Sequence, residues 1–190
     1  MADYKGLKLR ASGRELGIAI DSWGAKAVVM SSSDVYMGLQ RGTIDGANSG
    51  VTSFVSRKWY EAANYVQLLE ELPSTIDFIC NLKWWKSLTD EQRTIITESI
   101  RKAALWEFQA TIDQLDKNIQ FLKDKGLEVF DMKNQAPEEH KKMREATIVG
   151  LKKHIVPSVG QASWDENIRM LKATEKGTRT WKDVIMGLKY

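Results

Sequence analysis

The chain has 190 residues, of which 43% are hydrophobic and 28% are charged, and both shares are ordinary for a globular protein. This composition excludes a disordered or low-complexity chain, and the apolar runs are too short for a transmembrane helix. The net charge of +3 is too small and too dispersed to indicate a nucleic-acid partner. One cysteine, Cys80, cannot form an internal disulfide, and with only two histidines the sequence offers no His/Cys zinc cluster.

The first part of the chain alternates short strand-like and helix-like segments. A strand is predicted at residues 7–11, which alternate and are flanked by glycines, a second at the apolar run 27–30 and a third short one at 44–47. Helices are predicted between them, one at 14–23 and one that starts at Ser33, a favourable N-cap residue. This order predicts an open α/β layer with parallel strands.

A long helix dominates the prediction for the middle of the chain. Before it, we expect a helix at residues 51–65 and strands at 66–69 and 75–81. A short turn or helix is expected at 83–87. Thr89 is a suitable N-cap and Gln92 stands where it completes a capping box. Neither Gly nor Pro follows until Gly126, which predicts a helix of about 35 residues, roughly 50 Å long at 1.5 Å per residue.

The apolar residues of this long helix recur three and four apart and form one seam. The seam consists of Leu105, Phe108, Ile112, Leu115, Ile119 and Leu122. Such a helix either bridges two lobes, packs against a partner chain or lies across its own domain, and the spacing alone leaves these alternatives open.

The last part of the chain is predicted to be mostly helical. A strand is expected at 127–130, followed by a helix that begins near Asn134 and ends where Pro157 interrupts it. The remaining residues are expected to form two short helices around a loop at 175–180.

Few side chains in the sequence offer catalytic chemistry. The sequence contains no glycine-rich phosphate loop, nucleophile elbow or zinc-protease motif. His140 and His154 are interpreted as solvated residues of one lysine-rich helix, and Cys80 as a buried, inert thiol. The aromatic residues are interpreted mainly as core or interface residues, with ligand stacking as the alternative: Trp59, Tyr60, Trp84, Trp85 and Trp106.

Arg10 is the polar residue that the pattern singles out. It lies among apolar neighbours near the carboxyl end of the first predicted strand, and ligands of open α/β sheets gather at the carboxyl ends of strands. A guanidinium there can bind a carboxylate through two parallel hydrogen bonds and stays charged at any working pH. The alternative is an ordinary exposed arginine on a strand.

Four ordered blocks of sequence resemble one protein family. They are GLKLR (6–10), WGAKAVVMSSSDVY (23–36), LQRGTIDGA (39–47) and RKWYEAANY (57–65). Trp85, Leu88, Asp90, Gln92 and Ile95 match the start of that family's very long helix. In these motifs the chain resembles the DctP-like solute-binding proteins of TRAP (tripartite ATP-independent periplasmic) transporters, clearly over about residues 4–125.

The resemblance implies a periplasmic-binding-protein-like α/β lobe with a mostly parallel sheet. The very long helix would bridge to an incomplete second lobe or to a partner chain. Residues 4–80 and 127–190 are expected to form the solute-binding lobe, and residues 83–126 the bridging helix with a remnant of the other lobe. Because the chain resembles only the C-terminal portion of such proteins, we expect a fragment that lacks most of the N-terminal lobe and the secretory signal, and that binds solute weakly or not at all by itself.

The resemblance also implies a function without catalysis, cofactor or metal. The chain would serve in the periplasm, capture a small organic acid and deliver it to the TRAP membrane permease. The family's carboxylate-binding arginine falls on Arg10, and further ligand-binding positions fall on Ser32, Asn48 and Ser49. A homodimer through the seam of the long helix is expected to cover apolar surface. The alternatives are a small α/β enzyme acting on an acidic substrate and a helical self-association module.

Overall fold

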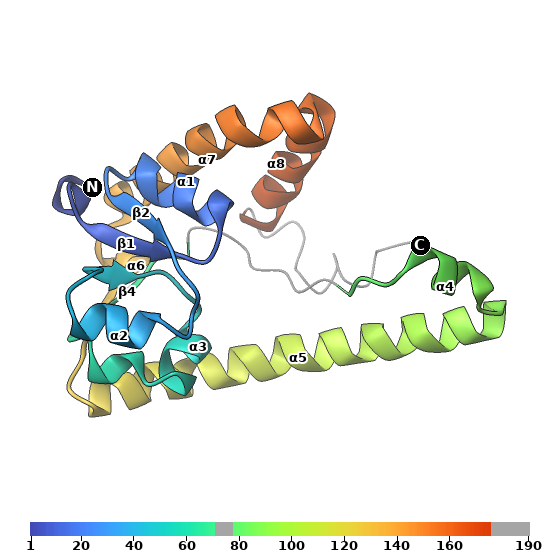
Figure 1. Ribbon diagram of the computed structural model, residues 1–190, viewed down its shortest axis with the longest axis horizontal. Helices are drawn as coiled ribbons and strands as arrows, with labels where there is room; N and C mark the ends of the chain where they lie inside the picture. The colour runs from blue at the N-terminus through green and yellow to red at the C-terminus, as the bar shows by residue number, and fades with distance from the viewer. Residues whose placement is uncertain (71–77, 176–190) are drawn as a thin grey trace. The chain divides into compact units, whose positions relative to one another are not determined.

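The computed structural model describes residues 1–70 and 78–175 (Figure 1). The strands are β1 (Lys8–Ala11), β2 (Lys26–Val29), β3 (Gly46–Ala47), β4 (Tyr65–Leu68) and β5 (Glu128–Asp131). The α-helices are α1 (Arg14–Ser22), α2 (Val35–Gln40), α3 (Val51–Ser56), α4 (Leu82–Ser87), α5 (Asp90–Asp124), α6 (Met132–Gln135), α7 (Pro137–Val159) and α8 (Gln161–Glu175). Two 3-10 turns, η1 (Ala2–Tyr4) and η2 (Trp59–Glu61), complete the described elements.

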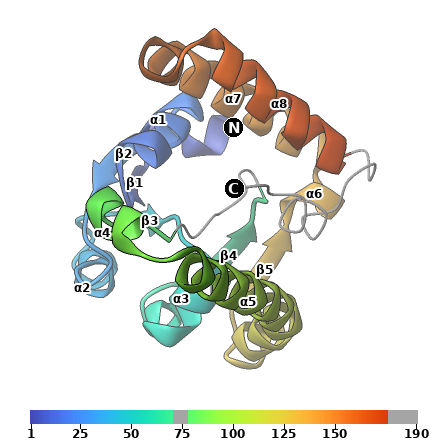
Figure 2. The same cartoon turned by 90° about the vertical axis from the view of Figure 1, so that its right-hand side faces the viewer.

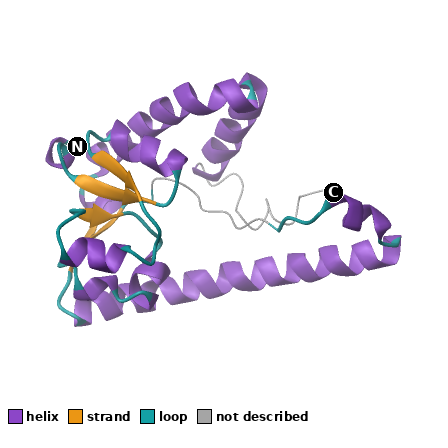
Figure 3. Ribbon diagram, viewed as in Figure 1, coloured by secondary structure: helices purple, strands orange, loops and turns teal. Residues whose placement is uncertain are grey.

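The chain divides into two compact units. Unit 1 comprises Met1–Leu72 and Leu115–Trp164, and unit 2 comprises Pro73–Gln114 and Asp165–Tyr190. The five strands of the described chain, drawn in orange in Figure 3, all belong to unit 1 by their residue ranges. The division of the chain into a lobe and a bridging helix remains a prediction.

A three-stranded parallel sheet of order β2-β1-β3 forms the centre of unit 1. Arg10, on the middle strand, pairs with Val28 of β2 and Ala47 of β3. A second, two-stranded parallel sheet joins β4 to β5, which lie side by side in Figure 2. All of these strand pairs are parallel, which confirms the predicted α/β layer with parallel strands. Helices or turns connect the successive strands, as parallel pairing requires.

Side chains of β1 alternate between two small cores. Leu9 and Ala11 face the core that α1 forms with α6 and α7, around Ile20 and Met143. Arg10 points to the other face of the sheet, toward the core that contains Trp59. The sheet therefore has helices on both faces. Of the two charged residues of β1, Lys8 and Arg10, only Arg10 is buried.

A buried hydrogen bond joins the beginning of unit 1 to its end. The indole Nε1 of Trp23, just after α1, donates to Oγ1 of Thr147 on α7 at 2.8 Å. Thr147 is fully buried and Trp23 is 3% exposed. Figure 1 shows α7 running beside α1, and their contact closes the lobe over the sheet.

The long helix is confirmed, with the predicted start. It spans 35 residues as α5. The backbone N–H of Thr89 donates to Oε1 of Gln92 at 2.9 Å, and the N–H of Gln92 donates to Oγ1 of Thr89 at 3.2 Å. These reciprocal bonds are the predicted capping box, which satisfies two amides that a helix start leaves without partners.

The seam on α5 is not uniformly exposed. Leu122 is fully buried in unit 1, whereas Ile112 is 49% and Leu115 40% exposed. Self-association through the seam stays a prediction, and Leu122 is not available for it.

The helix predicted at residues 51–65 is wrong in its second half. Helix α3 ends at Ser56, and Lys58 takes a left-handed conformation with φ 56°. This turn starts η2 and directs Trp59 into the core, where it is 1% exposed. No glycine or proline marks the turn, so the sequence gives no local warning of it.

Two further predictions of element ends are wrong. Ser33 does not cap α2: the N-cap position is Asp34, and neither side chain accepts a bond from the helix start. Pro157 does not end α7, which continues to Val159. The proline lies in the last turn, where only a few backbone bonds remain to be lost.

The predicted strand at 75–81 is not observed in its described part. Residues 75–77 lie outside the described residues, and residues 78–81 have no regular structure. Cys80 is exposed, not buried as predicted. The loop predicted at 175–180 and the last helix beyond it also lie almost entirely outside the described residues.

His140 is buried, which corrects its interpretation as a solvated residue. It is 6% exposed, and its Nε2 lies 2.5 Å from the carbonyl oxygen of Leu69, just after β4. His140, Met143, Thr147 and Leu151 form the buried face of α7. The histidine therefore links the two-stranded sheet to this helix.

Candidate functional site

Arg10 lies at the carboxyl edge of the three-stranded sheet and is 4% exposed. Its Nε donates to the carbonyl oxygen of Met30 at 2.9 Å, and its Nη1 donates to the carbonyl oxygen of Asn48 at 3.1 Å. Met30 follows β2 and Asn48 follows β3. The two neighbouring strands thus each supply one main-chain oxygen that orients the guanidinium.

One edge of the guanidinium is left for a ligand. The Nε–H already donates to Met30. A ligand carboxylate therefore cannot accept two bonds from the side edge that Nε and Nη2 form. Nη2 donates to no oxygen in the described part of the chain, and it is not among the buried atoms sealed from solvent. The open donors are therefore those of the Nη end, which can contact an incoming carboxylate end-on.

The ring of Trp59 forms the floor beneath this charge. The Cζ of Arg10 lies 5.9 Å from the centroid of the indole ring, which is a cation–π contact at the outer part of its range. Phe54 meets the same indole edge-on, with centroids 6.3 Å apart. Trp59 is thereby held in place by α3 and in turn supports the guanidinium.

The site is electropositive. Burial lowers the pKa of Arg10 from its usual value, and the positive charge of Arg57 lowers it further. An arginine remains charged under such shifts. No acidic side chain in residues 1–70 and 78–175 forms an ion pair with Arg10, so main-chain oxygens orient the positive charge and no carboxylate neutralises it.

The other predicted ligand-binding residues lie on loops at the same edge of the sheet. Asn48 directly follows β3, its N–H donates to the carbonyl oxygen of Arg10 at 3.2 Å, and its side chain is half-buried. Ser49 is exposed beside it, and Ser32 is half-buried in the loop between β2 and α2. Asn48 is joined to Arg10 through the main chain; Ser32 and Ser49 make no direct hydrogen bond to it. Their contact with a solute remains a prediction.

Two features around Arg10 were not predicted from the sequence: the nearby positive charge of Arg57 and the contact of the Trp59 ring with the guanidinium. Both residues belong to the RKWYEAANY block that carries the family resemblance. The clue in the sequence was therefore the motif itself, since neither residue stands near Arg10 along the chain.

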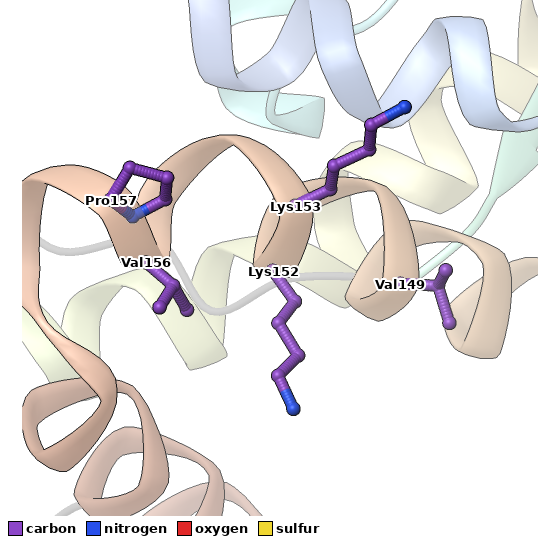
Figure 4. A pocket seen from close by; sticks show the side chains of 5 residues that line it. All are labelled: Val149, Lys152, Lys153, Val156 and Pro157. Atoms are coloured by element: carbon purple, nitrogen blue, oxygen red, sulfur yellow. The ribbon is translucent and has the colours of Figure 1, made fainter.

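The other candidates to weigh in the described part of the chain are a metal site and a surface hollow. In residues 1–70 and 78–175, no group of three or more His, Cys, Asp or Glu side chains could hold a metal ion. A hollow of about 390 Å³ is lined by five residues of α7 alone: Val149, Lys152, Lys153, Val156 and Pro157. Figure 4 shows Lys152 and Lys153 pointing to different sides of the helix, so this is the outer surface of one helix. No helix of the described chain is long and apolar enough to span a membrane.

The chain thus contains a parallel α/β lobe with a buried arginine at the carboxyl ends of its strands, where open α/β sheets gather their ligands. The comparison with known families identifies it further. The chain belongs to the DctP family, described as bacterial extracellular solute-binding protein, family 7, whose model matches residues 1–156. This confirms the TRAP-type resemblance of the motif blocks.

Relatives by sequence carry matching names. A solute-binding protein of Chromohalobacter salexigens is 37% identical over 112 residues, which are 55% of this chain and 33% of that protein. The sialic acid-binding periplasmic protein SiaP of Vibrio cholerae is 27% identical over 128 residues, covering 67% of this chain and 40% of that protein. The chain thus spans about a third to two fifths of the length of these two relatives.

Solved structures confirm the fold. A TRAP periplasmic solute-binding protein of Ochrobactrum anthropi, with its C-terminus bound in the ligand-binding pocket, matches with a TM-score of 0.74 and 22% identity over 93% of this chain and 54% of that one. A protein of this class from Pseudomonas putida, with bound D-glucuronate, matches with a TM-score of 0.71 and 21% identity over 90% of this chain and 53% of that one.

Proposed function

We propose that this chain provides the carboxylate anchor of a TRAP-type extracellular solute-binding protein, and that Arg10 is that anchor. The protein would capture a small organic acid and deliver it to the membrane permease, without catalysis. The observation that carries this proposal is the guanidinium of Arg10, buried and oriented by two main-chain oxygens while its Nη2 donors remain open. A buried cation that lacks an acidic partner is stabilised when an anion arrives.

Relatives support the solute class. The printed names include a C4-dicarboxylate-binding periplasmic protein of Rhodobacter capsulatus and a 2,3-diketo-L-gulonate-binding periplasmic protein of Escherichia coli. Their ligands share a carboxylate on a small polar skeleton. Ser32, Asn48 and Ser49 would then bind the hydroxyl or carbonyl groups of that skeleton, since hydroxyl and amide groups can both donate and accept.

The test is binding of small acids to the full chain, followed by NMR. D-Glucuronate and succinate, titrated to millimolar concentrations, should shift the Nε–H resonance of Arg10 and the backbone amide of Asn48. Arg10→Lys keeps a positive charge and loses the planar fork. It should weaken binding about tenfold or more, because hydrogen bonds to charged groups are worth about 1.5–3 kcal/mol.

Arg14→Lys serves as the matched control, because Arg14 is an exposed arginine at the start of α1. Resonances of the buried residues Ala19 and Ile20 report whether each variant is folded. Equal binding to Arg10→Lys and Arg14→Lys would refute the anchor role. An absence of shifts at Arg10 with both acids would refute the proposal for these solute classes.

A further inference from the structure

Arg57 is a second basic residue that the structure brings close to Arg10. It caps the C-terminal end of α3, one residue before the left-handed turn at Lys58 and two residues before Trp59. Because the ring of Trp59 contacts the guanidinium of Arg10, and consecutive Cα atoms are about 3.8 Å apart, the backbone of Arg57 lies within a few residue lengths of the anchor.

The chain loops around Arg10 between Asn48 and Trp59. The loop begins where the carbonyl oxygen of Asn48 accepts the bond from Nη1, and it ends where the indole ring reaches the guanidinium. Helix α3 lies within this loop, and Arg57 follows the helix two residues before the loop ends at Trp59. Two arginines thus belong to one local structure, although they are far apart in sequence.

Arg57 has no acidic partner among the described residues. Its backbone N–H donates to the carbonyl oxygen of Ser53, and its exposed side chain forms no ion pair in residues 1–70 and 78–175. Its positive charge is nevertheless felt at Arg10, whose pKa it lowers. Like charges repel each other, and an anion that binds between or beside these two arginines offsets their repulsion.

We propose that Arg57 is a second anion-binding residue of the solute site, and that the site therefore prefers solutes with two negative charges over matched solutes with one. This inference rests on the proposed function, because it takes Arg10 as the anchor of the first carboxylate. Arg57 determines specificity: its exposed side chain contacts the second acidic group, while Arg10 fixes the position of the first.

The expected preference is modest, because an ion pair with a solvent-exposed arginine is worth little. Exposed pairs contribute about 0.2–1 kcal/mol, which corresponds to a preference of roughly 1.4- to 5-fold. The preference should shrink as salt is added, since salt screens an exposed pair far more than a buried one.

The experiment compares two pairs of solutes that differ mainly in one charge. The pairs are D-glucarate against D-gluconate and succinate against succinamate, titrated into the full chain and followed at the Nε–H of Arg10. The variant is Arg57→Gln. The matched control is Arg41→Gln, because Arg41 is exposed and caps the end of α2 as Arg57 caps the end of α3.

Arg57→Gln should abolish the preference for the doubly charged solute and leave the affinity for the singly charged one nearly unchanged, whereas Arg41→Gln should keep the preference. An unchanged preference in Arg57→Gln would overturn the role of Arg57 and leave the anchor role of Arg10 intact. If all four acids leave the Arg10 resonance unmoved, the proposed function fails for these solutes, and the inference fails with it.

Discussion

The hydrogen bond between Trp23 and Thr147 allows a sharp test of how unit 1 is held together. Replacement of Thr147 by Val keeps the shape of the side chain and removes the acceptor of the indole N–H at 2.8 Å. The same change removes the hydroxyl that donates to the carbonyl oxygen of Met143 at 3.0 Å. Since Thr147 is fully buried, water cannot replace the lost acceptor.

The expected loss of unfolding free energy is about 1–2 kcal/mol. A buried donor left without a partner costs about 1–3 kcal/mol, and an added buried methyl group returns about 0.8 kcal/mol at most. Thr147→Ser is the matched control, because it keeps the hydroxyl and loses only the methyl group. It should cost about 1 kcal/mol, the value expected for one buried methyl group and the space it leaves.

Native-state hydrogen exchange of the α1 and α7 amides is the appropriate assay, because it reports on unit 1 without assuming that both units unfold together. Trp23→Phe in the Thr147→Val background separates the bond from the packing: without the indole donor, the valine should cost much less than it does beside Trp23. If Thr147→Val is as stable as the wild type, or if its cost is the same with and without the indole, the bond does not join α1 to α7 energetically.

The remaining predictions concern backbone fit and pH. Gly17→Ala should raise the melting temperature, because the new methyl group meets its nearest neighbour at an ordinary 3.5 Å and alanine favours a helix interior by about 1 kcal/mol over glycine. Gly150→Ala should gain less than Gly17→Ala, because its methyl group would lie 3.1 Å from Cβ of Ser22 on α1 and this crowding offsets the same helix preference. Asp131 accepts two bonds from Asn134, which hold the pKa of its carboxyl below its usual value. The carboxylate therefore stabilises α6 at neutral pH, and this stabilisation is lost as the pH falls through the lowered pKa. In thermal melts from pH 7 down to pH 3, Asp131→Asn should lose stability less steeply at the acid end than the wild type does. An unchanged slope would refute the assignment.

Local signals in the sequence predicted most elements of unit 1 and the start of α5. The capping box of Thr89 and Gln92 depends on two side chains three residues apart, so a short stretch of sequence contains all of the information. The three strands of the central sheet were likewise predictable from short segments: an alternating stretch between two glycines for β1, an apolar run for β2 and a third short strand after it for β3.

The errors arose where long-range packing overrides local preference. Residues 57–61 have no helix breaker, yet the chain turns at Lys58 because the indole of Trp59 gains more from burial in the core than from a further helical turn. His140 was interpreted from its lysine-rich neighbours, but it belongs to the buried face of α7 and meets Leu69, 71 residues away along the chain. Neither contact has a signature within a single element.

The same distinction explains why Arg10 could be singled out while its surroundings could not. Its place near the end of an apolar strand is a local pattern, but its two partners are the main-chain oxygens of Met30 and Asn48, which any residue at those positions would supply. Had an aspartate oriented the guanidinium, the pair would have been visible in the sequence as two opposite charges, and the site would have been nearly neutral.

Orientation by main-chain oxygens has a functional consequence. It fixes the geometry of the guanidinium without neutralising it, so the full positive charge remains for a solute anion. Because main-chain oxygens at the ends of two strands orient Arg10, substitutions at Ser32, Ser49 or Arg57 should not displace it. In our proposal the anchor and the selection of the solute are therefore separate: the sheet positions Arg10, and Arg57, whose charge acts on Arg10, contributes from outside the sheet.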